Sequence, residues 1–148
     1  MKNNKKGIII GGVVLVALIA IFAVVGTTAS AANYDKVAKR ICAKYTKAAK
    51  AGSFVGKVKV TYKKQKGAYN FTFTLNMDQD DSTFAMLKLM GGNYYNETRD
   101  SFKSTTTKLR KDIKKQGIKK VNVTYIVKAK GKKLWVAKNG KITYDKYK

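Results

Sequence analysis

The residues whose side chains are most suited to binding a ligand are lysines that cluster near the C-terminal end of the chain. Five of them surround the single tryptophan between residues 128 and 138, and three more lie within residues 111–115. A lysine ammonium is a point charge that attracts phosphate and carboxylate groups without reading a sequence. An aromatic ring beside such charges offers a face on which a base can stack. The expected polyanion-binding residues are Lys128, Lys130, Lys132, Lys133, Trp135, Lys138, Lys111, Lys114 and Lys115.

The overall charge favours an anionic partner. Lysine and arginine number 32 against 8 acidic residues, which gives a formal net charge of +24. A surplus of this size attracts polyanions over long distances. Arginine is rare, however, and lysine, asparagine, isoleucine and tyrosine are abundant, as an AT-rich genome encodes by default. Selection for a ligand and codon usage are therefore both open explanations of the charge.

Catalytic chemistry finds little support in the residue types. Histidine is absent, which removes the commonest general base and transition-metal ligand. The lone Cys42 excludes an intrachain disulfide and a thiolate zinc site. The acidic cluster at 78–81 resembles the start of a calcium loop, but Thr83 stands where glycine is required and Leu89 where glutamate is required. We expect a helix cap there, and no enzyme activity, cofactor or metal.

The N-terminal segment predicts that the protein is located outside the cytoplasm. A basic start, MKNNKK, precedes residues 8–25, which contain no polar side chain. As a helix these would span ~27 Å, close to the ~30 Å hydrocarbon core. Ala29 and Ala31 supply the small side chains that a signal peptidase accepts. Residues 1–31 are thus a signal peptide cut near Ala31, for a secreted protein, or a retained membrane anchor in a bacterial envelope.

Residues 32–53 predict a basic amphipathic helix. Between 34 and 50, Tyr34, Val37, Ile41 and Tyr45 share one side, and lysines occupy the other. Two interpretations are open. The helix either lies on anionic lipid next to the membrane exit or packs its apolar stripe on the following domain.

Residues 54–148 predict a small α+β extracytoplasmic domain. Alternating apolar and polar residues indicate two β-hairpins, and helical spacing indicates a short helix at 83–90 and a longer one at about 96–116. The order α-β-β-α-β-β predicts a four- to five-stranded antiparallel sheet covered by helices on one face. The strands are expected at 57–62, 71–77, 120–125, 134–138 and 141–144.

Two motifs carry a resemblance to known proteins. The longer helix contains F-x-x-x-T-x-x-L-x-x-x-I at 102–113, and G-I-x-x-V-x-V-x-Y follows at 117–125, before a basic turn. This order resembles small exported domains of unknown function from low-GC Gram-positive bacteria, many of them lipoproteins. The resemblance covers roughly residues 54–148 and implies an extracytoplasmic location without an established activity. This chain departs from the lipoprotein members because it lacks the lipobox cysteine.

Together these features predict an exported, strongly basic cell-envelope protein. Its most direct role is a non-catalytic module that binds an anionic cell-wall polymer, such as teichoic acid, or a membrane surface through its lipid headgroups. Extracellular nucleic-acid binding is the first alternative, and a protein-interaction domain with incidental charge is the second. No small-molecule substrate is inferred.

Overall fold

A computed structural model describes residues 33–52 and 56–148 of the chain. The expected signal peptide or anchor at 1–31 lies outside these ranges. In the described part of the chain, no helix combines the length and apolar character that crossing a bilayer requires. The elements are α2 (Tyr34–Gly52), β1 (Gly56–Gln65), β2 (Ala68–Met77), α3 (Asp81–Leu89), α4 (Asn93–Lys115), β3 (Val121–Ala129), β4 (Lys132–Lys138) and β5 (Lys141–Asp145).

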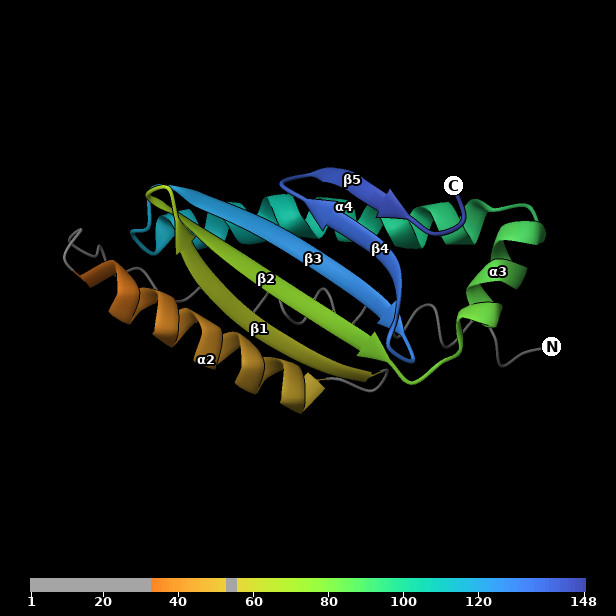
Figure 1. The fold of residues 1–148 in the computed structure, drawn as a ribbon, viewed down its shortest axis with the longest axis horizontal. Coiled ribbons are helices and arrows are strands. Elements are labelled where there is room, and N and C mark those ends of the chain that lie inside the picture. Colours follow the sequence, from red (N-terminus) through yellow and green to blue (C-terminus); the bar gives the residue numbers. More distant parts are fainter. Residues whose placement is uncertain (1–32, 53–55) are drawn as a thin grey trace.

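The strands form one five-stranded sheet in the order β1-β2-β3-β4-β5 (Figure 1). The α+β class and all five expected strands are confirmed. The prediction of an antiparallel sheet is wrong in one place, because β2 and β3 run parallel. The 10 residues of β2 advance the chain by ~33 Å and the 23 residues of α4 return it by ~35 Å. The chain therefore re-enters the sheet where β2 began, and Val121 lies opposite Tyr69.

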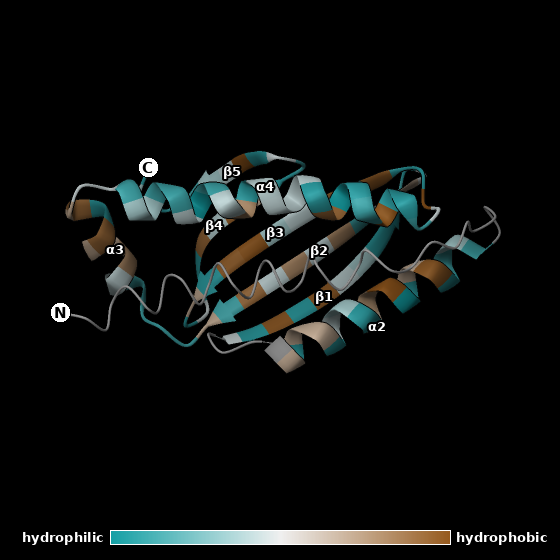
Figure 2. Ribbon diagram, turned by 180° about the vertical axis from the view of Figure 1, so that it is seen from behind, coloured by the Kyte–Doolittle hydropathy of each residue, from teal (hydrophilic) through white to brown (hydrophobic). Residues whose placement is uncertain are grey.

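Both long helices cover the same face of the sheet. The strand pattern alternates between buried and more exposed residues, as in β3, where every second side chain from Val121 to Ala129 is buried. Tyr45 of α2 packs edge-on against Phe73, and Phe102 of α4 packs against Tyr125. Because Phe73 and Tyr125 are register partners, both helices must contact the same side. Seen from behind in Figure 2, α4 lies in front of β3 and β4, with α2 alongside β1.

The apolar stripe of α2 packs on the domain. Val37, Ala38, Ile41 and Tyr45 are buried, while the lysines of the helix point to solvent. The domain-packing interpretation of this helix is therefore confirmed for the apolar stripe. Burial also raises the pKa of the half-buried Cys42 thiol to about 11, so the thiol stays protonated at neutral pH.

The helical crossover begins and ends close to where the sequence predicts. Asp80 caps α3, because its Oδ1 accepts a hydrogen bond from the backbone N–H of Ser82 at 3.2 Å. Gly92, with a φ of 73°, ends the turn between α3 and α4, so α4 starts at Asn93, three residues before the expected Asn96. The stripe Phe102, Thr106, Leu109 and Ile113 is buried against the sheet, as predicted.

Candidate polyanion-binding surface

The side of the sheet opposite α2 and α4 is lined by polar and basic side chains. Alternation along a strand sends every second residue to this side, and the pairing register then aligns these residues across the five strands. We call this surface the open face. Its side chains are Lys57, Lys59, Thr61 and Lys63 of β1, Asn70, Thr72, Thr74 and Asn76 of β2, Asn122, Thr124, Ile126 and Lys128 of β3, Lys133, Val136 and Lys138 of β4, and Lys141 and Tyr144 of β5.

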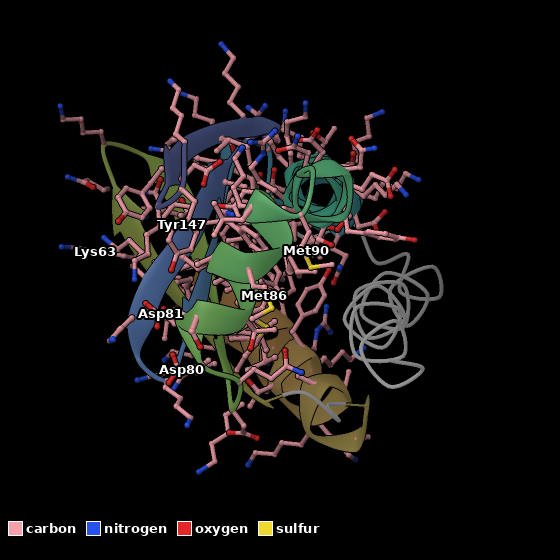
Figure 3. All side chains as sticks on the ribbon, turned by 90° about the vertical axis from the view of Figure 1, so that its right-hand side faces the viewer. Lys63, Asp80, Asp81, Met86, Met90 and Tyr147 are labelled. Atoms are coloured by element: carbon pink, nitrogen blue, oxygen red, sulfur yellow. The ribbon has the colours of Figure 1, made fainter. Side chains whose placement is uncertain are left out.

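Lysines occupy the flanks of the open face. Lys57, Lys59 and Lys63 stand along β1, while Lys128 pairs directly with Lys133, and Lys138 with Lys141, at the other side. Figure 3 shows Lys63 pointing to the side of the sheet away from α4. Like charges directly opposite each other on one face of a sheet destabilise the fold. A bound anion that lies between them would remove this repulsion.

The acidic residues of the chain lie elsewhere. All eight fall within the described ranges, on the helices, in the link from β2 to α3, or on the covered side of β5. None of them neutralises a lysine of the open face. The charged side chains of the open face are therefore all cationic, whereas the outer side of α4 carries both signs. The acidic residues are Asp35, Asp78, Asp80, Asp81, Glu97, Asp100, Asp112 and Asp145.

The middle of the open face is a floor of short neutral side chains. Thr61, Thr72 and Thr124 stand in one row across three strands, and Thr74 lies next to them. Among the residues that the structure describes, the hydroxyls of these threonines have no hydrogen-bond partner. They face solvent with both a donor and an acceptor available.

Asparagines close one end of this floor. Asn122 Nδ2 donates to Asn70 Oδ1 at 3.0 Å, and Asn139 Nδ2 donates to Asn122 Oδ1 at 2.9 Å. Asn139 Oδ1 in turn accepts from the backbone N–H of Val123 at 2.9 Å. These amides are committed to one another, so they fix the register of β2 and β3 and contribute less to ligand binding than the threonines.

The structure separates the nine residues that the sequence singled out. Lys128, Lys133 and Lys138 lie together on the open face. Lys130 lies in the β3–β4 turn, and Lys132, the first residue of β4, pairs with Ala129 and places its Nζ 3.6 Å from Asp81 Oδ1. The remaining lysines, Lys111, Lys114 and Lys115, are exposed on α4, on the opposite side of the molecule.

Trp135 does not belong to a binding surface. Its side chain is 1% exposed, and its indole N–H donates to the Tyr95 hydroxyl at 2.7 Å. A β-bulge gives Leu134 no partner on β3, so that Leu134 and Trp135 are both buried. The expectation that this ring contacts a ligand is therefore corrected. Tyr144 is the one aromatic side chain on the open face of the described sheet.

Ion pairs fix the C-terminal strand against the helices. Arg99 Nη1 lies 2.9 Å from Asp145 Oδ2, and the Tyr95 hydroxyl also donates to Asp145. Burial alone would raise the pKa of Asp145, but the hydrogen bonds from Tyr95 and Arg99 lower it below its usual value. Likewise, the hydrogen bond from Lys146 lowers the pKa of Asp81. Arg99 and Lys146 are thus paired with carboxylates away from the open face, and we assign these contacts a structural role.

Besides Lys141 of β5, the sequence analysis missed three basic residues of the open face, Lys57, Lys59 and Lys63, which lie on β1. Their signal was present, because they alternate with Val58, Val60 and Tyr62 in a strand whose apolar residues were assigned to the core. The sequence did not reveal which strands pair with each other in the sheet. The parallel pairing of β2 with β3 places Lys57 in one row with Lys128 and Lys133, through Asn76 of β2.

The described residues offer little for other chemistry. Outside the masked ranges, no group of three or more acidic or cysteine side chains could hold a metal ion. A shallow groove of about 480 Å³ separates α4 from β5, lined among others by Arg99, Lys103 and Lys141. Comparison of the chain with protein-family models, curated proteins and solved structures finds no match.

Proposed function

We propose that this protein is an exported, non-catalytic module that binds an anionic polymer of the cell envelope through its open face. The observation that carries the proposal is the segregation of charge. Seven lysines share the sheet face that none of the described helices covers, and the acidic residues of the chain lie elsewhere. The apolar segment at 8–25 supports export of the domain to the place where wall polymers and lipid headgroups occur.

The contact is electrostatic and sequence-independent. Lysine binds a phosphate as a point charge, and each lysine that engages the polymer releases counterions. Binding should therefore weaken steeply as salt rises. Nucleic acid is the less favoured partner, because the burial of Trp135 leaves Tyr144 as the aromatic stacking platform on the described open face.

Two triple variants test the proposal with equal loss of charge. One replaces Lys57, Lys59 and Lys63 by Gln on β1, and the other replaces Lys111, Lys114 and Lys115 by Gln on α4. Both remove three exposed lysines, so a purely non-specific effect of net charge would be the same in each. The full chain, kept in neutral detergent, is sedimented with isolated bacterial cell walls at low and high ionic strength.

The β1 variant should lose wall binding on the order of 100-fold at low salt, at roughly 1 kcal/mol for each of its three lysines. The α4 variant should retain most of it. Wild-type protein that fails to bind walls at low salt, or that binds equally at high salt, would refute the proposal. Equal losses in both variants would refute the assignment to the open face.

A further inference from the structure

We infer that the open face takes a linear chain of hydroxylated units joined by phosphodiester groups. This inference rests on the proposed function and specifies the ligand class of the same surface. Charge alone suits any polyanion, so the evidence must come from the neutral residues between the lysines. Their arrangement differs from what a bilayer or a bare phosphate chain would use.

The lysines of the open face stand on either side of a lower floor. β1 carries Lys57, Lys59 and Lys63, and β4 carries Lys133 and Lys138; between them lie β2, which has no lysine on this face, and β3, which has Lys128 near its C-terminal end. Three strand spacings place the two lysine rows ~14 Å apart. Along β1, Lys57 and Lys59 lie ~7 Å apart, because they are two residues apart in a strand. A single extended chain along β2 and β3 would have ammonium groups within reach on both sides.

The floor carries hydroxyl groups that are free to bind. Thr61, Thr72 and Thr124 lie side by side across β1, β2 and β3, and Thr74 lies one position further along the same face of β2. Within the described ranges no hydrogen bond holds these hydroxyls. Each of them can donate one hydrogen bond and accept two. A ligand with its own hydroxyl groups between the phosphates can satisfy them.

This geometry distinguishes three kinds of polyanion. The long lysine side chains would meet a flat bilayer before the short threonines could, so a lipid surface would leave the floor unused. A bare phosphate chain offers oxygen acceptors but no hydroxyl donors. A hydroxylated phosphodiester chain matches the charges at the sides and the hydroxyls in the middle. The threonines therefore give selectivity within a surface whose affinity comes from lysine.

The test removes hydroxyls and keeps the charge. The double variant Thr72→Val, Thr124→Val replaces each hydroxyl by a methyl group of similar size, and valine is well tolerated in strands. The matched control, Thr83→Val and Thr107→Val, changes two exposed threonines on α3 and α4. The full chain in neutral detergent is titrated calorimetrically with poly(glycerol phosphate), inorganic polyphosphate of equal charge, and vesicles that contain phosphatidylglycerol.

We expect the wild type to prefer poly(glycerol phosphate), and the open-face double variant to lose about tenfold affinity for it while its affinity for polyphosphate falls less. The control variant should match the wild type for both polymers. Equal wild-type affinities for the two polymers, a stronger preference for vesicles, or an equal loss for both polymers in the open-face variant would overturn this inference alone. If no probe binds at low salt, the proposed function fails, and the inference fails with it.

Discussion

The indole N–H of Trp135 donates a 2.7 Å hydrogen bond to the hydroxyl of Tyr95, inside the core between β4 and α4. The Tyr95 hydroxyl in turn donates a hydrogen bond to the Asp145 carboxylate, which also accepts one from Arg99. Burial, together with the hydrogen bond to Asp145, raises the pKa of Tyr95 above its ordinary value. The single tryptophan of the chain thus belongs to a polar network that joins β4 and β5 to α4.

Replacing Tyr95 by phenylalanine should lower the free energy of unfolding by about 1 to 3 kcal/mol, because it leaves the buried indole N–H without its acceptor. Thermal and urea unfolding, followed by circular dichroism, would measure this loss. The variant should retain polyanion affinity, since Tyr95 is remote from the open face. A variant as stable as the wild type would contradict the assigned network.

The buried indole also predicts a spectroscopic result. Trp135 is the one tryptophan of the sequence, so its fluorescence reports on one site. We expect blue-shifted emission, weak quenching by iodide, and almost no change when a polyanion saturates the protein. Strong iodide quenching, or a large change on binding, would mean that Trp135 lies at the surface, as the sequence analysis first suggested.

Acid should destabilise the fold through Asp145 and Asp81. Both carboxyls have a lower pKa in the folded chain than in the unfolded chain, where an aspartate titrates near ~3.9. Their contribution to stability is therefore complete above about pH 5 and is lost as the pH falls toward their folded pKa values. The Asp145→Asn variant should be less stable at pH 7 and should depend less on pH below 5. Unfolding curves at several pH values would show whether it does.

The salt dependence of binding should shrink when lysines of the open face are removed. For a single-stranded polyanion, each engaged lysine contributes about 0.7 to the slope of log K against log salt concentration. The triple variant of Lys57, Lys59 and Lys63 should therefore reduce the magnitude of this negative slope by about 2. The triple variant of Lys111, Lys114 and Lys115 should leave the slope within error of the wild type. Equal slopes in all three proteins would contradict the role of the open face.

Local patterns in the sequence were enough to predict most of the architecture. Alternation in the strands and the buried stripe of α4 fixed which side chains enter the core, and Asn139-Gly140, with φ of 49° and 83°, formed the expected turn. These features depend on neighbours within a few residues. The parallel pairing of β2 and β3 depends instead on the length of α4, which decides at which end of the sheet the chain returns.

The candidate site was harder to predict than the fold. Lys128, Lys133 and Lys138 were singled out because they are dense in the sequence, and they do share the open face. The same criterion, a high local density of lysine, also selects Lys111, Lys114 and Lys115, which lie on α4 on the other side of the sheet. Strict alternation could not reveal the bulge at Leu134, so it gave no sign that two adjacent large residues are both buried.

Lysine footprinting tests the central claim most directly. The full chain in neutral detergent is labelled with an amine-reactive reagent, with and without poly(glycerol phosphate), and the modified lysines are quantified by mass spectrometry. The account predicts that the polymer protects Lys57, Lys59, Lys63, Lys128, Lys133, Lys138 and Lys141, while Lys111, Lys114 and Lys115 remain reactive. Protection of the α4 lysines instead, or equal protection of both sets, would contradict it.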